Sequence, residues 1–197
     1  MIPDWAGDVP RETLERLEGY VALLEKWNRT INLVAKNDDI WSRHIWDSYQ
    51  LLPLIPPTAK TLIDLGSGAG LPGLVIAIAR PMAVTLVERD RRKTSFLREA
   101  ARSLGLKDVV ILAEDAGTLG GKYDVITARA LASLNALNEL AAPLMGTNAI
   151  CLFPKGRNFA SEVEEAGRDW SFDCQCVPSR TQEDSSIVSL SKLKRKG

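Results

Sequence analysis

The chain has 197 residues, of which 45% are apolar, and it carries 25 basic and 25 acidic side chains. This size suits one domain with a substantial core, and the balanced charge argues against the strongly basic surface of many nucleic-acid binders, although local distribution also matters. Three cysteines without repeated spacing do not predict a disulfide framework or a metal site, and no apolar run is long enough to cross a bilayer. We therefore expect buried free thiols, no metal and a cytoplasmic location.

The first part of the chain is predicted to be helical. Apolar residues recur at helical spacing, which predicts an amphipathic helix over 10–29 and a second helix over 38–53. Prolines at 53, 56 and 57 end this pattern. We expect an N-terminal helical extension over residues 1–57.

The remainder, residues 58–197, alternates short apolar strands with helices. Strands are expected at 61–65, 84–88, 109–112, 123–127, 149–153, 171–177 and 186–192, and helices at 74–79, 91–104, 133–144 and 158–168. This alternation predicts βαβ units and a mainly parallel sheet. The last two strands have only a polar loop between them, which indicates an antiparallel hairpin. The expected fold is α/β and Rossmann-like, with seven strands of which one is antiparallel, packed with the extension as one unit.

A glycine-rich segment at 62–73 lies between the first strand and the following helix, where parallel sheets bind ligands. One interpretation is a dinucleotide site, because residues 68–73 satisfy the GxGxxG pattern and Glu88 follows the next strand. Two residues fit it poorly. Pro72 removes an N–H that a pyrophosphate would use, and Asp64 would repel that anion.

The second interpretation is S-adenosylmethionine, which carries positive charge and no phosphate and therefore tolerates an acid beside it. Glu88 would accept the ribose hydroxyls, and Glu114 or Asp115, after the third strand, would meet the adenine amino group. The residues assigned to this ligand are Asp64, Gly66, Gly68, Gly70, Glu88, Glu114 and Asp115. We favour the methyl donor and keep the dinucleotide as the alternative.

Five stretches resemble the bacterial 16S ribosomal RNA guanine-N7 methyltransferases, the glucose-inhibited division protein B family. They are WNRTINL at 27–33, RHIWDS at 43–48, DLGSGAGLPG at 64–73, AED at 113–115 and TARALASL at 127–134. The glycine loop is shared by many methyltransferases, whereas the second and fifth stretches are more specific.

The resemblance implies S-adenosylmethionine as the methyl donor and 16S ribosomal RNA of the small ribosomal subunit as the partner. Gly66 and Leu71 would line the donor's cleft, with Ala113 and Glu114 beside the adenine. Arg129 would lie near the methyl-transfer centre at the end of the fourth strand.

Guanine N7 presents a lone pair and loses no proton, so the reaction needs no general base. His44, Asp47 and Arg129 are the candidate catalytic residues. We expect His44 to act as a hydrogen-bond partner within the helical part or to contact a ligand, and not as a base. Asp47 would favour the cationic guanine, or else make a contact within its helix. Arg129 would grip a phosphate, a base acceptor edge or the donor's carboxylate, or else form an ion pair with Asp64 or Glu114.

RNA contact has to come from local basic groups. The candidates are Arg43, Arg91, Arg92, Lys93 and Lys155, although such clusters can also be solvated surface. Nothing in the sequence demands more than a monomer. The competing functions are methylation of another RNA position or a small molecule, and RNA binding without catalysis.

Overall fold

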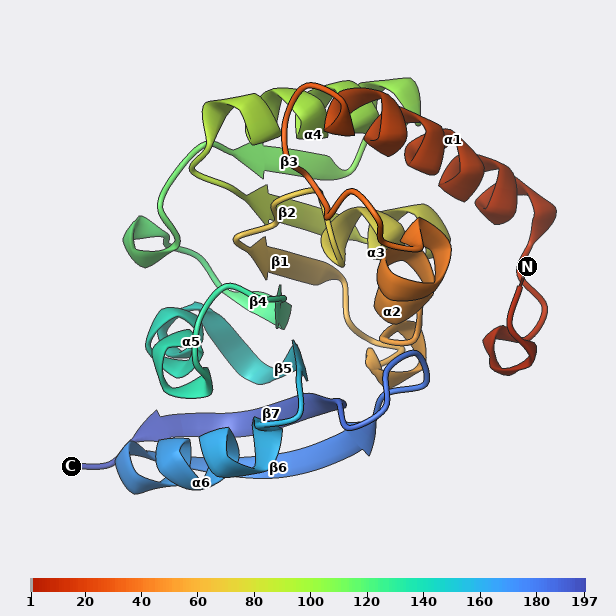
Figure 1. Ribbon diagram of the computed structural model, residues 1–197. Coiled ribbons are helices and arrows are strands. Elements are labelled where there is room, and N and C mark those ends of the chain that lie inside the picture. Colours follow the sequence, from red (N-terminus) through yellow and green to blue (C-terminus); the bar gives the residue numbers. More distant parts are fainter. Residues whose placement is uncertain (1) are drawn as a thin grey trace.

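The computed structural model describes residues 2–197, and its centre is a seven-stranded sheet (Figure 1). The strands are β1 Thr61–Leu65, β2 Ala83–Val87, β3 Val109–Leu112, β4 Tyr123–Ala128, β5 Met145–Lys155, β6 Trp170–Pro178 and β7 Ser186–Arg195. They are ordered β3-β2-β1-β4-β5-β7-β6, and β7 alone runs opposite to the other six strands. The predicted α/β fold, with one antiparallel strand in a terminal hairpin, is confirmed.

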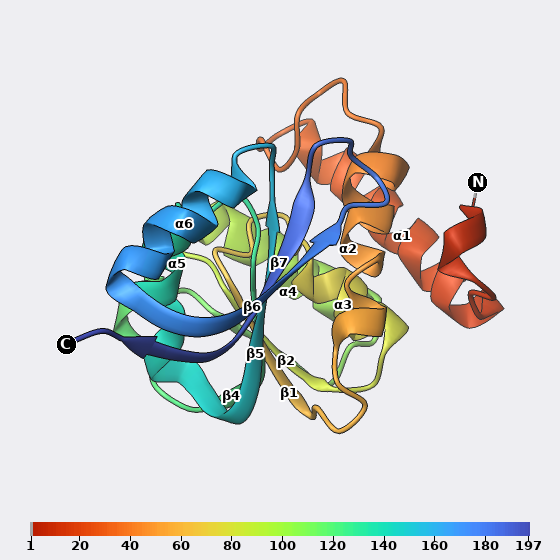
Figure 2. The ribbon, with the colours of Figure 1, turned by 90° about the horizontal axis from the view of Figure 1, so that it is seen from below.

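Helices cover both faces of the sheet (Figure 2). One layer holds α1 Arg11–Asn28, α3 Gly73–Ala79 and α4 Arg91–Ser103, and the other holds α5 Leu134–Ala141 and α6 Phe159–Asp169. Because side chains alternate along a strand, Leu62 is buried in the first layer and Ile63 in the second. None of the described helices is long and apolar enough to cross a membrane.

The segment between α1 and β1 differs from the expected single helix over 38–53. It consists of the π-helix η2 Trp41–Trp46, the short α2 Asp47–Tyr49 and the 3-10 turn η3 Leu52–Leu54. Residues five apart point roughly 140° away from each other in an α-helix, yet the Trp41 and Trp46 rings lie 5.7 Å apart. The wider π-turn brings these two rings together, and such turns are frequent at functional sites.

The expectation of three buried thiols is wrong for two of them. Cys151 lies in the central strand β5 and is buried, whereas Cys174 and Cys176 are exposed. Both belong to β6, which is an edge strand, and their sulfur atoms lie 3.9 Å apart on one face. An edge strand has a neighbour on one side only, so its side chains are covered less.

Candidate active site

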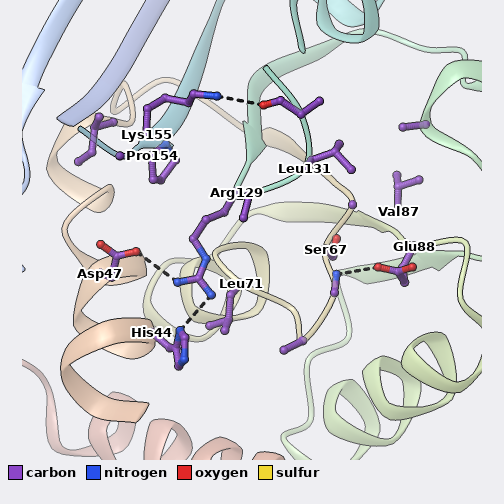
Figure 3. Close-up of a pocket in the computed structure, with 18 of the residues that line it drawn as sticks. His44, Asp47, Ser67, Leu71, Val87, Glu88, Arg129, Leu131, Pro154 and Lys155 are labelled. Carbon is purple, nitrogen blue, oxygen red and sulfur yellow. Dashed lines mark hydrogen bonds and ion pairs between the residues drawn. The ribbon is translucent and has the colours of Figure 1, made fainter. Parts of the chain in front are cut away.

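A pocket of about 850 Å³ opens at the edge of the sheet where the parallel strands end (Figure 3). Segments that follow β1, β2, β3, β4 and β5 all contribute to its wall. This volume lies within the ~300–1,000 Å³ typical of ligand sites. The wall has two parts, which we call the glycine-loop half and the Arg129 half. The first includes Gly66, Gly68, Leu71, Glu88 and Glu114, and the second includes Arg43, His44, Asp47, Arg129 and Lys155.

The glycine loop presents bare backbone to the pocket. Gly66 and Gly68 adopt φ values of +65° and +55°, a region that residues with a Cβ rarely occupy. A Cβ on Gly66 would lie 2.6 Å from Leu131 Cδ1. The loop is held from α1, because the buried Tyr20 hydroxyl donates to the Ala69 carbonyl at 2.6 Å. Gly70, by contrast, faces the core and does not line the pocket.

Asp64 lies behind the loop and is fully buried, outside the pocket wall. Its carboxylate accepts hydrogen bonds from the Thr127 hydroxyl at 2.7 Å and from the Gly73 N–H at 3.3 Å. Burial raises the pKa of Asp64 to about 6, and these hydrogen bonds oppose the shift. Because Gly73 begins α3, Asp64 occupies an N–H that a dinucleotide pyrophosphate would need.

Three acidic residues line the pocket on the side of the glycine loop. Glu88 follows β2, and its carboxylate accepts from the Gly68 N–H at 2.9 Å and the Asp90 N–H at 2.8 Å. Glu114 and Asp115 both line the pocket after β3, whereas Ala113 does not. Asp115 accepts from the Gly117 N–H at 3.0 Å as the cap of the turn η4 Ala116–Thr118. Its capping role leaves Glu114 as the better placed carboxylate for a ligand.

Arg129 crosses the opposite half of the pocket, between Asp47 and His44 (Figure 3). Its Nη1 donates to the Arg43 carbonyl at 3.1 Å and lies 3.3 Å from Asp47 Oδ2. Its Nη2 lies 3.1 Å from His44 Nδ1. The expected alternative, an ion pair with Asp64 or Glu114, is wrong, because the partner carboxylate comes from α2.

The two side chains that contact Arg129, those of His44 and Asp47, are themselves held. His44 Nε2 lies 3.0 Å from Asp38 Oδ2, and burial together with Arg129 lowers the pKa of His44 while Asp38 opposes the shift. Asp47 Oδ1 accepts from Gln50 Nε2 at 2.9 Å and from the Thr181 hydroxyl at 2.8 Å. Thr181 belongs to the β6–β7 loop, so the C-terminal hairpin is tied to the pocket through Asp47.

The five basic candidates occupy different surroundings. Lys155 is held by Glu162 at 2.6 Å and by the Ala132 carbonyl at 2.9 Å, with only 10% of its side chain exposed. The Arg43 side chain is half exposed at the pocket mouth. The remaining three lie in the first turn of α4, where Lys93 reaches the pocket wall and Arg91 and Arg92 are exposed beside it.

Sequence reasoning missed several residues that shape the pocket: Tyr20, Asp38, Thr127, Leu131 and Thr181. Tyr20 continues the apolar face of α1, so the helical spacing of apolar residues could have predicted that it is buried. Leu131 is a large apolar side chain that is 40% exposed. Thr181 has no local signal, since it lies in a polar loop 134 residues from Asp47.

Comparison with known families gives a match to GidB, described as rRNA small subunit methyltransferase G, over residues 13–188. The chain is 47% identical over 191 residues to the ribosomal RNA small subunit methyltransferase G of Rhodospirillum centenum, covering 96% of this chain and 88% of the relative. It is also 47% identical over 189 residues to the protein of the same name from Gluconobacter oxydans, covering 95% and 97%.

Solved structures show the same fold at low sequence identity. The magnesium protoporphyrin IX methyltransferase of Synechocystis PCC 6803, solved with bound S-adenosylmethionine, superposes with a TM-score of 0.62 at 14% identity, covering 93% of this chain and 98% of that one. A putative S-adenosylmethionine-dependent methyltransferase from Methanococcus maripaludis also gives 0.62, at 12% identity, covering 91% and 94%.

Proposed function

Because the chain belongs to the GidB family, rRNA small subunit methyltransferase G, we propose that this pocket carries a methyl group from S-adenosylmethionine to N7 of a guanine in 16S ribosomal RNA. Family membership confirms the predicted enzyme class and methyl donor and overturns the dinucleotide alternative. The observation that carries the assignment of the site is the bare backbone at Gly66 and Gly68, facing Glu88, with Arg129 across the pocket.

The residues of the pocket fit the methyl donor from end to end. Glu114 is placed for the adenine amino group, and Glu88, whose oxygens each keep a lone pair, for the ribose hydroxyls. Gly66 lines the pocket, and a Cβ there would press against Leu131, another residue of the wall, and push it into the space that the ligand needs. Arg129 lines the same pocket, in the half that is named after it, and we assign its guanidinium to the donor's carboxylate. Asp64 supports the loop from behind.

When bound, the donor supplies a sulfonium methyl group that the lone pair of guanine N7 takes in an in-line displacement, without loss of a proton. The residues around Arg129 agree with a reaction that needs no general base. Burial and Arg129 lower the pKa of His44, which favours its neutral form. Both ring nitrogens already face a partner, so His44 does not serve as a base. The pocket wall contributes mainly positioning and exclusion of water. Leu131 and Pro154 offer apolar surface to a base, and Asp47 balances the charge of Arg129.

A Glu88→Gln substitution is expected to raise the Kd for S-adenosylmethionine about 10-fold to 100-fold, since hydrogen bonds to a charged group contribute about 1.5–3 kcal/mol. The glutamine oxygen can still accept from the Gly68 N–H, so the loop should keep its shape. Titration calorimetry measures the effect, and Glu18→Gln on the exposed side of α1 is the matched control. An unchanged Kd in the Glu88 variant would remove this residue from the donor site.

The first turn of α4 is proposed as an RNA contact, because the helix dipole disfavours cations there and yet Arg91, Arg92 and Lys93 follow one another. Replacing all three with glutamine should reduce the slope of log K against log salt for RNA binding by about 2, at about 0.7 per phosphate contact. The control removes three charges at Arg98 and Arg102, in the second half of α4, and at Lys107, in the turn that follows it. Equal slopes in the two variants would contradict the assignment.

We further propose that the protein acts in the cytoplasm as a monomer, with the extension at 1–57 and the domain at 58–197 working as one unit. Two hydrogen bonds, Tyr20–Ala69 and Asp47–Thr181, support the two parts working as one unit, because both join the extension to the domain at the pocket. A single chain also supplies every wall of the pocket.

Transfer of labelled methyl from S-adenosylmethionine to small ribosomal subunits tests the proposed function. Subunits from cells lacking this protein should accept about one methyl per 16S RNA, and subunits from cells containing it should accept almost none. Donor binding without any transfer to RNA or subunits would support the alternative of a non-catalytic module.

A further inference from the structure

Two side chains of the N-terminal segment, Asp38 and His44, form a hydrogen-bond chain that ends at Arg129 in the pocket. Asp38 Oδ2 lies 3.0 Å from His44 Nε2, and His44 Nδ1 lies 3.1 Å from Arg129 Nη2. We propose that Asp38 and His44 are positioning residues, which fix the guanidinium of Arg129 in the orientation that receives the donor's carboxylate. The proposal rests on the proposed function for the identity of that ligand, whereas the hydrogen-bond chain stands without it.

The two partners of His44 select one form of its ring. A carboxylate only accepts hydrogen bonds, so the nitrogen that faces Asp38 has to carry the proton. A guanidinium only donates, so the nitrogen that faces Arg129 has to present its lone pair. Both conditions are met by the neutral ring protonated at Nε2, and by no other form.

Fixing His44 in this form matters because the anchoring groups of Arg129 all come from one short segment. The Arg43 carbonyl, His44 Nδ1 and Asp47 Oδ2 take three of the five N–H donors of the guanidinium. Two donors are left for a ligand. Without the acceptor at His44, Arg129 keeps contacts only through Nη1 and is free to rotate about it.

The charges around His44 set the pH range over which Nδ1 can accept from Arg129. Burial and Arg129 lower the pKa of His44, whereas Asp38 and Asp47 raise it, and Arg43 lies 3.4 Å from Asp38 Oδ1. A proton on Nδ1 would place two donors against each other. The donor's affinity should therefore be lost as pH falls through the pKa of His44, which lies below the ordinary histidine value.

Nuclear magnetic resonance of the imidazole ring tests the first step directly, since His44 is the one histidine of the chain and its signals need no assignment. Two-bond nitrogen–proton correlations at pH 7.5 should show the proton on Nε2. A proton on Nδ1, or a charged ring at this pH, would overturn the proposal whatever the enzyme's activity.

The second step is tested with Asp38→Asn, because an amide can donate as well as accept and carries no charge. We expect a mixture of ring tautomers, a Kd for S-adenosylmethionine about 2-fold to 10-fold higher, and an acid midpoint of binding at lower pH. Asp39→Asn is the control: its side chain accepts from the Trp41 and Ser42 N–H groups, which asparagine also allows, so neither the ring nor the Kd should change.

Coupling decides whether Asp38 acts through His44. In a His44→Gln background, Asp38→Asn should have no further effect on the Kd. Additive effects of the two substitutions would show that Asp38 acts by another route and would overturn the proposal. If the wild-type chain bound no S-adenosylmethionine while the ring showed the expected tautomer, the proposed function would fail and the hydrogen-bond chain would stand.

Discussion

A Gly66→Val variant is expected to fold and to lose measurable binding of S-adenosylmethionine, with a Kd at least about 100-fold higher. Gly66 has φ +65°, where a residue with a side chain is strained by about 1–2 kcal/mol. The new Cβ would lie 2.6 Å from Leu131 Cδ1. Since Leu131 is partly exposed, it can move, and both side chains would then occupy the glycine-loop half of the pocket.

The matched control for this variant is Gly105→Val. Gly105 also has φ +65°, but a Cβ there meets no atom within 4 Å, and the residue lies away from the pocket. The control should share the loss of thermal stability and keep the wild-type Kd. Unchanged affinity in Gly66→Val would place the methyl donor elsewhere.

An Arg129→Gln variant is expected to raise the Kd for S-adenosylmethionine about 10-fold to 100-fold, because it loses a charged partner for the carboxylate. Methyl transfer at fixed donor concentration should fall at least as far. The variant also leaves the mostly buried Asp47 carboxylate without its cation, so unfolding should become easier by about 3 kcal/mol. Titration calorimetry and thermal unfolding measure the two effects separately.

The double variant with Asp47→Asn separates binding from stability. Removing both charges should restore most of the lost stability, because no unpaired carboxylate remains, whereas the affinity for the donor should stay low. Recovery of affinity in the double variant would mean that Arg129 serves only to neutralise Asp47. In the single Asp47→Asn variant, donor affinity should fall, because Asp47 helps to hold Arg129; a fall in turnover with unchanged donor affinity would instead assign Asp47 to the cationic guanine.

The sheet and the glycine loop were predictable because their signals are local. The apolar run of β3 gave its bounds, Val109–Leu112, directly, and the glycines mark a turn that needs positive φ. The π-turn within the second helical segment, at Trp41–Trp46, was not predictable, since apolar spacing was interpreted with the period of an α-helix.

The sequence also did not predict the contacts that join distant segments around the site. Asp47 is 82 residues from Arg129, and nothing in either stretch indicates that they pair. Asp64 resembled a ligand residue because it precedes the glycines, but the strand turns its side chain toward Thr127 and Gly73, away from the pocket. Residue type identified segments that line the pocket, and only the fold decided which of their side chains face it.

The most direct test of the central claim is the chemical identity of the product. Small subunits lacking the modification would be incubated with the protein and labelled S-adenosylmethionine, and the 16S RNA digested to nucleosides. The account predicts that the label appears as 7-methylguanosine, at one position of the RNA. Label in any other nucleoside would keep the methyltransferase assignment and contradict the claim that this pocket presents guanine N7 to the methyl group.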